Sequence, residues 1–530
     1  MRNIVNIVNF IRGVEPRMPM DLVEPVARQI ELMKAHGLPG TFLFQYDAMI
    51  RPDMVSLFDG IDRDQFEIGV WLEMNRPMVE KAGLPWRGRP GFDWDWAANV
   101  GFSVGYTPKE REKLIDVLFE KFREVFGEYP LSVGSWMIDA HSLEYMQQKY
   151  GIDAACICKD QWGTDGYTIW GGYWNQGYYP SRYNVLSPAQ TPAAQIPVPM
   201  FRMLGSDPVT QYDLGLDVNS QASECQAVAT LEPVYPLGGG SEAWIDWFMR
   251  QNFSGNSLAF AYAQAGQENS FGWPAMEFGL KAQFKRFEEM RDQGKLIVER
   301  MGDTGRWFKR SFDSTPATSV AALEPMRYNP QVPAEANAAA LEHDDQSVWY
   351  DCKNYRVNWL WRQGALRLRD FYLFSEDYRE RYLNAVCETE YLVYDNLPIM
   401  DGNRMSGDGV LAGGFVVCKQ DGRWVDAQCT RLRVSEIENG LRLDFEVQGK
   451  AARIELTEQG VRLEGGFGLR FDWCPARAAA CQGVRDGLLR YRHNGADYAL
   501  RAQDGRIEAQ DGSYLILPQG EGMAISAARV

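Results

Sequence analysis

Residues 107–160 read TPKEREKLIDVLFEKFREVFGEYPLSVGSWMIDAHSLEYMQQKYGIDAACICKD. The first part, 107–127, begins with a Thr at the N-cap position and has apolar residues at helical spacing, so it predicts a helix. LSVGSWMID (131–139) then predicts a strand, SLEYMQQKYG (142–151) a helix and AACICKD (154–160) a strand. This alternation of helix and strand is typical of β-α units built around a parallel sheet.

The same alternation extends from this stretch in both directions, up to about residue 310. Further strands are predicted over NIVNFI (6–11), GTFLFQYD (40–47), FEIGVWLEM (66–74), QIPVPMFRM (195–203), NSLAFAYAQ (256–264) and KLIVERM (295–301). About seven or eight units of this kind favour a closed barrel over an open sheet. We therefore expect an α/β fold class, with a seven-stranded (β/α) barrel as the catalytic domain over residues 1–310.

The character of the sequence changes after the expected barrel. Residues 311–345 are rich in Pro and Ala, and we expect a linker and a wrapping helical segment over 311–400. Beyond it lie short alternating runs with Gly and Asp turns, such as GLRLDFEVQGKAARIELTEQGVRLEGG (440–466). This pattern predicts an antiparallel β-sandwich domain over 401–530. The aromatic stretch 359–374 either covers the barrel or forms a contact between copies in a homo-oligomer, and the sequence leaves both open.

Charge and cysteine content restrict the partners and the compartment. The chain has 530 residues and a formal net charge of −16, so we expect no nucleic-acid partner and no anionic membrane partner. The N-terminus lacks the continuous apolar core of a signal peptide, and no apolar stretch is long enough to span a bilayer. Nine scattered cysteines fit free thiols, which predicts a cytoplasmic location.

Polar side chains follow most of the predicted barrel strands. Since the carboxyl ends of parallel barrel strands meet at one face, these side chains are expected to converge there and form the active site. A single acid at such a position often only caps the next helix, but several acids at one face would repel one another without a ligand, cation or proton. Our candidate catalytic residues are Asp139, Glu73, Glu268 and Asp160. Our candidate substrate-binding residues are Arg12, Glu15, Gln45, Asp47, Trp71, Trp136, His141, Lys159, Trp162, Trp170, Trp174 and Arg202.

Two long loops rich in Trp, Tyr, Asp and Gly follow predicted strands, at 87–106 and 159–184. Aromatic faces stack on sugar C–H surfaces, while amides and carboxylates bind hydroxyl groups, so such loops favour a carbohydrate substrate. Loops packed by their own aromatic residues are the alternative, and for Trp94 and Trp96 both interpretations stay open.

Three segments resemble the superfamily of polysaccharide deacetylases (NodB homology) and barrel glycoside hydrolases. GTFLFQYD is similar to the "ATFF" strand of the deacetylases, and FEIGVWLEMNRP (66–77) is similar to their "EIGNHTWSHP" segment. EYPLSVGSWMIDAHSLEYM (128–146) occupies the place of their "FRPPYG" strand and the helix after it. The resemblance implies a barrel fold and activity on carbohydrate.

The chain departs from the deacetylases at their metal site. Deacetylases bind a divalent metal through an Asp on the first strand and two His four residues apart; here those His positions are Trp71 and Asn75, and the first strand is followed by Arg12 and Glu15. The resemblance thus implies the glycosidase-like branch, and we expect no metal and no cofactor. A rearranged metal site at Asp139 and His141 is kept as an alternative.

Glycosidic cleavage needs one carboxyl group that protonates the leaving oxygen and one carboxylate that acts as nucleophile or base. We expect Asp139, with a pKa raised by partial burial, to act together with Glu73 or Glu268. The sequence therefore predicts a glycoside hydrolase acting on an oligosaccharide or glycoside in a Trp/Tyr-lined cleft. A metal-dependent carbohydrate hydrolase or isomerase is the first alternative. A non-catalytic sugar-binding protein, with its acids paired to Arg or Lys, is the second.

Overall fold

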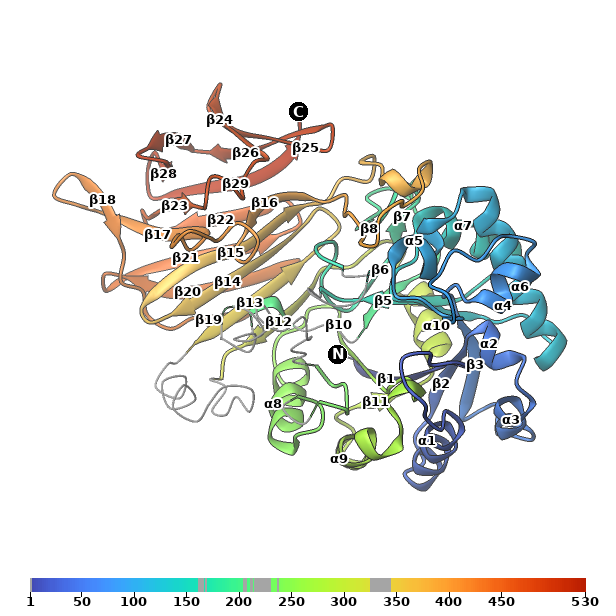
Figure 1. Cartoon of the computed structure of the whole chain (residues 1–530). Helices are drawn as coiled ribbons and strands as arrows, with labels where there is room; N and C mark the ends of the chain where they lie inside the picture. The colour runs from blue at the N-terminus through green and yellow to red at the C-terminus, as the bar shows by residue number, and fades with distance from the viewer. Residues whose placement is uncertain are drawn as a thin grey trace.

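The computed structural model describes residues 2–160, 166, 169–203, 207–209, 213, 230–235, 238–324 and 345–530. The first half of the chain, blue to green in Figure 1, forms a parallel sheet surrounded by helices. The second half, gold to red, forms antiparallel sheets that pack beside it. Among the described residues, no helix is both long enough and apolar enough to cross a membrane.

The barrel sheet consists of parallel strands whose side chains are almost all buried. They are β1 (Arg2–Ile11), β2 (Gly40–Phe44), β3 (Phe66–Trp71), β4 (Ser132–Gly134), β5 (Ala154–Cys158), β9 (Met200–Met203) and β10 (Phe260–Ala265). Their order in the sheet is β10-β1-β2-β3-β4-β5-β9, and β6 (Gly177–Tyr178) lies antiparallel on β9. Near-continuous apolar runs such as GTFLF suit strands buried on both faces.

The sheet curves into a barrel-like arrangement. The expected α/β fold class with a barrel is confirmed at that level. The short strand β11 (Ile297–Val298) pairs with β1 next to β10, so a count of barrel strands depends on whether β11 is included. In the described part of the chain, no hydrogen-bonded ladder joins β9 to β10. The count of seven barrel strands therefore stays an interpretation.

Helices cover the outside of the barrel, and those predicted over 107–127 and 142–151 are confirmed. The longer helices are α1 (Val23–Ala35), α6 (Pro108–Phe126), α7 (Ala140–Tyr150), α8 (Glu242–Phe253) and α9 (Trp273–Asp292). Shorter helices are α2 (Tyr46–Met49), α3 (Pro52–Val55), α4 (Arg76–Lys81) and α5 (Ala98–Gly101). Helix α6 begins with a capping box, in which the Thr107 hydroxyl accepts from the Glu110 amide and the Glu110 carboxylate accepts from the Thr107 amide.

One helix that the sequence did not predict, α10 (Met301–Ser311), covers the N-terminal ends of the barrel strands. Its first amides donate to the Thr41 hydroxyl and the Glu67 carboxylate, both at 2.9 Å, and its Arg306 pairs with Asp153 just before β5. Gly305 allows this close approach, because a Cβ there would lie 2.6 Å from the Asp153 carbonyl oxygen. Helix α10 therefore fills this end of the barrel, and we expect an active site at the opposite end.

The second half of the chain contains two large antiparallel sheets. The ten-stranded sheet runs β12 (Thr318–Ala322), β13 (Gln346–Asp351), β14 (Tyr355–Arg362), β15 (Ala365–Leu373), β17 (Gly413–Gln420), β23 (Gly468–Asp472), β28 (Ser513–Pro518) and β27 (Gly505–Gln510), with β16 (Leu397–Asp401) on β15 and β18 (Arg423–Asp426) on β17. The eight-stranded sheet runs β19 (Arg433–Ile437), β20 (Gly440–Val447), β21 (Lys450–Thr457), β22 (Gly460–Glu464), β29 (Gly522–Arg529), β26 (Ala496–Gln503), β25 (Leu488–His493) and β24 (Cys481–Arg485). A remaining pair, β7 (Pro180–Ser181) and β8 (Asn184–Pro188), follows β6.

These two sheets share one buried apolar cluster, to which Trp359, Leu368, Leu443 and Ile454 all belong. A core between two antiparallel layers is the arrangement that a β-sandwich requires, and the sandwich stays our interpretation of it. We expected a linker and a wrapping helical segment over 311–400; residues 325–344 of this range lie outside the described residues, and the described ones do not form a wrapping helix. The described residues there form β12 to β16 instead, with only a short 3₁₀ turn at Arg381–Leu383.

Candidate active site

Arg12 is the centre of a cluster of acids at the C-terminal end of the barrel. It directly follows β1, and its guanidinium lies 3.2 Å from a Glu268 oxygen and 3.4 Å from a Glu73 oxygen. A Glu15 oxygen lies 3.8 Å away. All four side chains are at most 5% exposed. The sequence thus correctly predicted that strand ends far apart in the chain bring these charges together.

Glu73 receives more hydrogen bonds than the other acids of this cluster. The indole of Trp94 donates to one of its carboxylate oxygens at 2.7 Å. The Gln45 amide and the Trp71 indole donate to the other at 2.5 and 3.0 Å. Complete burial nevertheless raises the pKa of Glu73 to about 7, against the opposing effect of the Arg12 charge. Glu73 therefore exchanges its proton near neutral pH.

Aromatic rings form the floor and the cover of the cluster. Below Glu73, Phe10 stacks on Trp71 with 4.0 Å between ring centroids, and Trp136 meets both rings edge-on. Above it, the guanidinium carbon of Arg12 lies 4.2 Å from the centroid of a Trp94 ring. Trp94 comes from the loop after β3, and it is buried. This loop therefore covers Arg12 and Glu73.

A fourth acid, Glu232, belongs to the same region and was not predicted from the sequence. Burial, together with the negative charge of Glu268, raises its pKa to about 8. It lies in LEPVY (231–235), a stretch with no periodicity and no strand end to mark it. A sequence pattern therefore had no signal for it.

Two further candidates, Glu15 and Asp47, hold the loop that follows β1. Asp47 accepts hydrogen bonds from the amides of Val14 and Ala48, and burial raises its pKa to about 6. Burial acts to raise the pKa of Glu15 as well, but hydrogen bonds and charge from Arg17 outweigh it and lower the pKa. Asp47 thus holds the backbone next to Arg12, and Glu15 lies beside the Arg12 guanidinium itself.

Asp139 departs from our expectation of a raised pKa. It caps α7, and its carboxylate accepts from the Arg111 guanidinium at 3.0 Å and from the hydroxyls of Ser103 and Ser142 at 2.7 Å each. Burial acts to raise the pKa, but Arg111 and the two hydroxyls outweigh it, so the pKa of Asp139 is lowered. The expectation of a raised pKa for Asp139 was therefore wrong, while its role as a catalytic residue stays a prediction.

The arrangement around Asp139 does not favour the rearranged metal site either. His141 lies against Glu112 at 3.1 Å, whereas the Asp139 carboxylate is engaged by Arg111 and serines. Within the described ranges, no group of three His, Cys, Asp or Glu side chains is arranged to hold a metal ion. The described donor set therefore offers no ready metal cage.

Asp160 and Arg202 lie in a buried network between the barrel and the ten-stranded sheet. The Asp160 carboxylate accepts from Arg356 of β14 at 3.0 Å, and Arg202 donates to the Cys158 carbonyl at 2.7 Å. Both side chains are fully buried. Asp160 was a candidate catalytic residue and Arg202 a candidate substrate-binding residue, but in the structure both lie in contacts that join two parts of the protein.

The tryptophans after β5 are placed in the same interface. Trp170 donates to Asp401 of β16 at 2.7 Å, and Trp174 stacks on Trp349 of β13 with 4.5 Å between centroids. Lys159 lies 5.3 Å from the centroid of the Trp174 ring, and burial lowers its pKa to about 8. Trp162 lies outside the described residues.

Comparisons with known proteins show a likeness of fold. No protein-family model matches the chain, and no curated protein matches it. It is similar to the structure of a "putative glycoside hydrolase/deacetylase" from Parabacteroides distasonis, with a TM-score of 0.51, 14% identity, and coverage of 75% of this chain and 89% of that one. It is also similar to a "putative polysaccharide deacetylase" from Mycobacterium smegmatis, with a TM-score of 0.35, 13% identity, and coverage of 58% and 91%. The comparison with the structure of Puue allantoinase gives a TM-score of 0.36 and 13% identity, with coverage of 58% of this chain and 90% of that one. The first likeness confirms the expected resemblance at the level of the fold.

Proposed function

We propose that the protein is a glycoside hydrolase in which Glu73 is the proton donor and Glu268 is the second carboxylate. The observation that carries this proposal is the contact of both carboxyl groups with the single guanidinium of Arg12, at 3.4 and 3.2 Å. Glycosidic cleavage requires two carboxyl groups at the scissile bond whose surroundings differ, so that one is protonated while the other is ionised. Asp139 and Asp160 are left out of this mechanism, because their ion-pair partners are Arg111 and Arg356 and not Arg12.

The proposed reaction begins with proton transfer from Glu73 to the glycosidic oxygen. A pKa of about 7 leaves a large fraction of Glu73 protonated at neutral pH, so the proton is available. The bond from the anomeric carbon to that oxygen breaks, and Glu268 acts from the other side, either as nucleophile or as base toward water. Water supplies the hydroxyl of the new reducing end, and its second proton returns to the carboxyl pair.

The aromatic residues around Glu73 suit a sugar ring. Trp136 and Trp71 offer an apolar floor, while Gln45 and Arg12 offer donors for hydroxyl oxygens. Since Trp94 covers Arg12 and is itself buried, substrate entry requires a movement of the 86–97 loop. The described cysteines are free thiols, which is in keeping with the cytoplasmic location that we also propose.

The test is hydrolysis of a panel of aryl glycosides and oligosaccharides by the wild type, Glu73→Gln and Glu268→Gln. We expect each variant to lose at least ~100-fold in kcat, because general acid–base catalysis contributes that much. Glu67→Gln is the matched control, since Glu67 lies on β3 at the opposite end of the barrel and should retain activity.

Two outcomes would contradict the proposal. One is wild-type turnover that persists in both variants. The other is turnover that EDTA abolishes, which would favour a metal-dependent reaction over a two-carboxylate one. Activity that survives EDTA and is lost in the two variants, with Glu67→Gln active, supports the proposal.

A further inference from the structure

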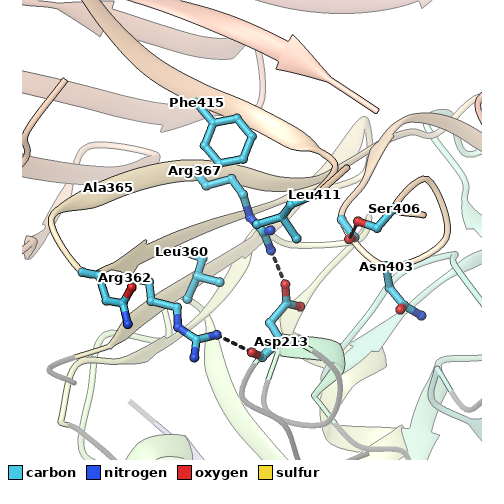
Figure 2. Close-up of a pocket in the computed structure, with 11 residues that line it drawn as sticks. Asp213, Leu360, Arg362, Ala365, Arg367, Asn403, Ser406, Leu411 and Phe415 are labelled. Atoms are coloured by element: carbon cyan, nitrogen blue, oxygen red, sulfur yellow. Dashed lines mark hydrogen bonds and ion pairs between the residues drawn. The ribbon is translucent and has the colours of Figure 1, made fainter. Parts of the chain in front are cut away.

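A pocket of about 430 Å³ opens on the ten-stranded sheet, away from the barrel cluster. Figure 2 shows its walls, which come from the β14–β15 hairpin, the loop after β16, the start of β17 and Asp213. This volume is in the range of small-molecule sites, which is about 300–1,000 Å³. The pocket can therefore hold a compact ligand such as one sugar unit.

Alternation along β14 explains which side chains reach this pocket. Trp359 is buried in the core between the two antiparallel sheets. Because side chains alternate along a strand, Leu360 and Arg362, one and three residues further on, point to the opposite face of the sheet. Arg367 lies directly across from Leu360 on β15 and shares that face. Arg362 and Arg367 thus lie on the face of this sheet that is opposite the core between the two antiparallel sheets.

The charges of the lining favour an anion. Arg367 is 5% exposed and pairs with Asp213, which also accepts from Arg369 at 2.7 Å. The Nε group of Arg367 is buried and has no hydrogen-bond partner within the described residues. The Arg362 side chain is 41% exposed. Arg362 donates to the backbone carbonyl of Asp213, and its own ion pair is with Asp345 at 3.5 Å, outside the lining. The lining itself holds two guanidinium groups and one carboxylate, that of Asp213, in a chain whose overall charge is −16.

The remaining lining combines apolar and polar groups in the way that sugar sites do. Leu411 is 53% exposed at the rim, and Phe415 on β17 offers a ring face. Asn403 adds an amide, while the hydroxyl of Ser406 donates to the Gly402 carbonyl and accepts from Ala412, which fixes the loop after β16. An apolar patch, an amide and paired arginines thus surround one volume (Figure 2).

We propose that this pocket binds an acidic sugar, a uronate unit whose carboxylate is held by Arg362 and Arg367. Arginine binds carboxylates through two parallel hydrogen bonds, which adds geometric specificity to the charge. The apolar C–H face of the sugar packs on Leu411 and Phe415, and Asn403 binds a hydroxyl group. This site is separate from the barrel cluster and does not depend on the hydrolase proposal.

Titration calorimetry of the full chain with D-glucuronate, and with D-glucose as the neutral probe, tests the proposal. We expect saturable binding of glucuronate in the millimolar range or tighter, and binding of glucose that is at least about tenfold weaker. Arg362→Gln removes one guanidinium and should weaken glucuronate about tenfold. Because Arg362 is part-exposed, this variant should still fold.

Leu411→Asp provides a second variant, since it places a negative charge on the exposed rim and should weaken glucuronate without disturbing the core. Arg506→Gln is the matched control, because this part-exposed arginine of the same sheet lies outside the pocket. Glu73→Gln should leave glucuronate binding unchanged. The proposal is overturned by absence of glucuronate binding, by equal binding of glucose, or by unchanged affinity in both Arg362→Gln and Leu411→Asp.

Discussion

Glu73 and Asp139 are both completely buried carboxyl groups near strand ends, yet their pKa values move in opposite directions. Glu73 shares Arg12 with two other acids, so the positive charge does not compensate its burial. Asp139 has an ion pair with Arg111 and accepts two hydroxyl hydrogen bonds, which together outweigh burial. Burial alone therefore does not identify a proton donor; the number of acids per cation does.

Glu73 should make the free energy of unfolding depend on pH. Its pKa rises from 4.5 in the unfolded chain to about 7 in the folded protein, so the folded state binds the proton more tightly. The resulting stabilisation is fully present below pH 4.5 and is lost as pH rises through 7. It amounts to at most about 3 kcal/mol. Glu73→Gln should remove this dependence.

Thermal unfolding of the wild type and Glu73→Gln across this pH window measures the effect. The difference between the two curves isolates Glu73 from the other acids of the cluster, including Glu232, which titrates in both proteins. A difference that stays constant from pH 4.5 to pH 8 would show that Glu73 keeps an ordinary pKa.

Part of this cluster could be predicted from the sequence. Arg12, Glu73 and Glu268 each follow an apolar strand, and parallel strands bring their ends to one face. Glu232 and the covering position of Trp94 could not be predicted, because they depend on how loops fold back over the barrel. The role of Asp139 also escaped prediction, since Arg111 lies on a different element and no local pattern shows where it points.

Among the elements, α6 and α10 illustrate how far local sequence determines structure. Helix α6 has a capping box at its start and ends at Gly127, whose φ of 85° suits a residue without a Cβ. The sequence contains both signals, and the helix was predicted with its bounds nearly correct. In α10, Gly302 and Gly305 lower the helix propensity, and the helix forms because the N-terminal end of the barrel packs against it.

Thr107→Ala should destabilise the protein by about 1 kcal/mol, because it removes the side-chain acceptor that caps α6. Urea unfolding followed by far-UV circular dichroism measures this loss. Lys113→Ala is the control: Lys113 is exposed in the same helix and should change stability by less than about 0.5 kcal/mol. Equal stability of Thr107→Ala and the wild type would mean that the capping box contributes nothing.

At the scale of the whole molecule, the barrel and the antiparallel sheets are joined by buried charges. Arg356 of β14 reaches Asp160 at the end of β5 and also pairs with Asp370 of β15 at 2.9 Å. A register shift between Asn358 and Trp359 lets Arg369 and Asp370 both contribute to this network. The sequence indicated two kinds of domain but gave no sign of this network, because its partners are about 200 residues apart.

Arg356→Met should destabilise the protein by about 3–5 kcal/mol, because Asp160 and Asp370 would remain buried without their shared partner. Guanidinium unfolding of the full chain measures the change, and a separate transition for each half would show that the halves have become uncoupled. Arg462→Met, at an exposed position of β22, is the control. A loss below about 1 kcal/mol would mean that the interface does not depend on this ion pair.

The pairing of β1 with β10 and β11 has a consequence for synthesis on the ribosome. β1 is translated first, but its partners on one side, Phe260–Ala265 and Ile297–Val298, are translated some 250 residues later. Until they emerge, one edge of a strongly apolar strand has no partner, and such an edge invites association with other nascent chains. The barrel sheet is therefore completed late in translation, and this edge of β1 stays open to such association until then.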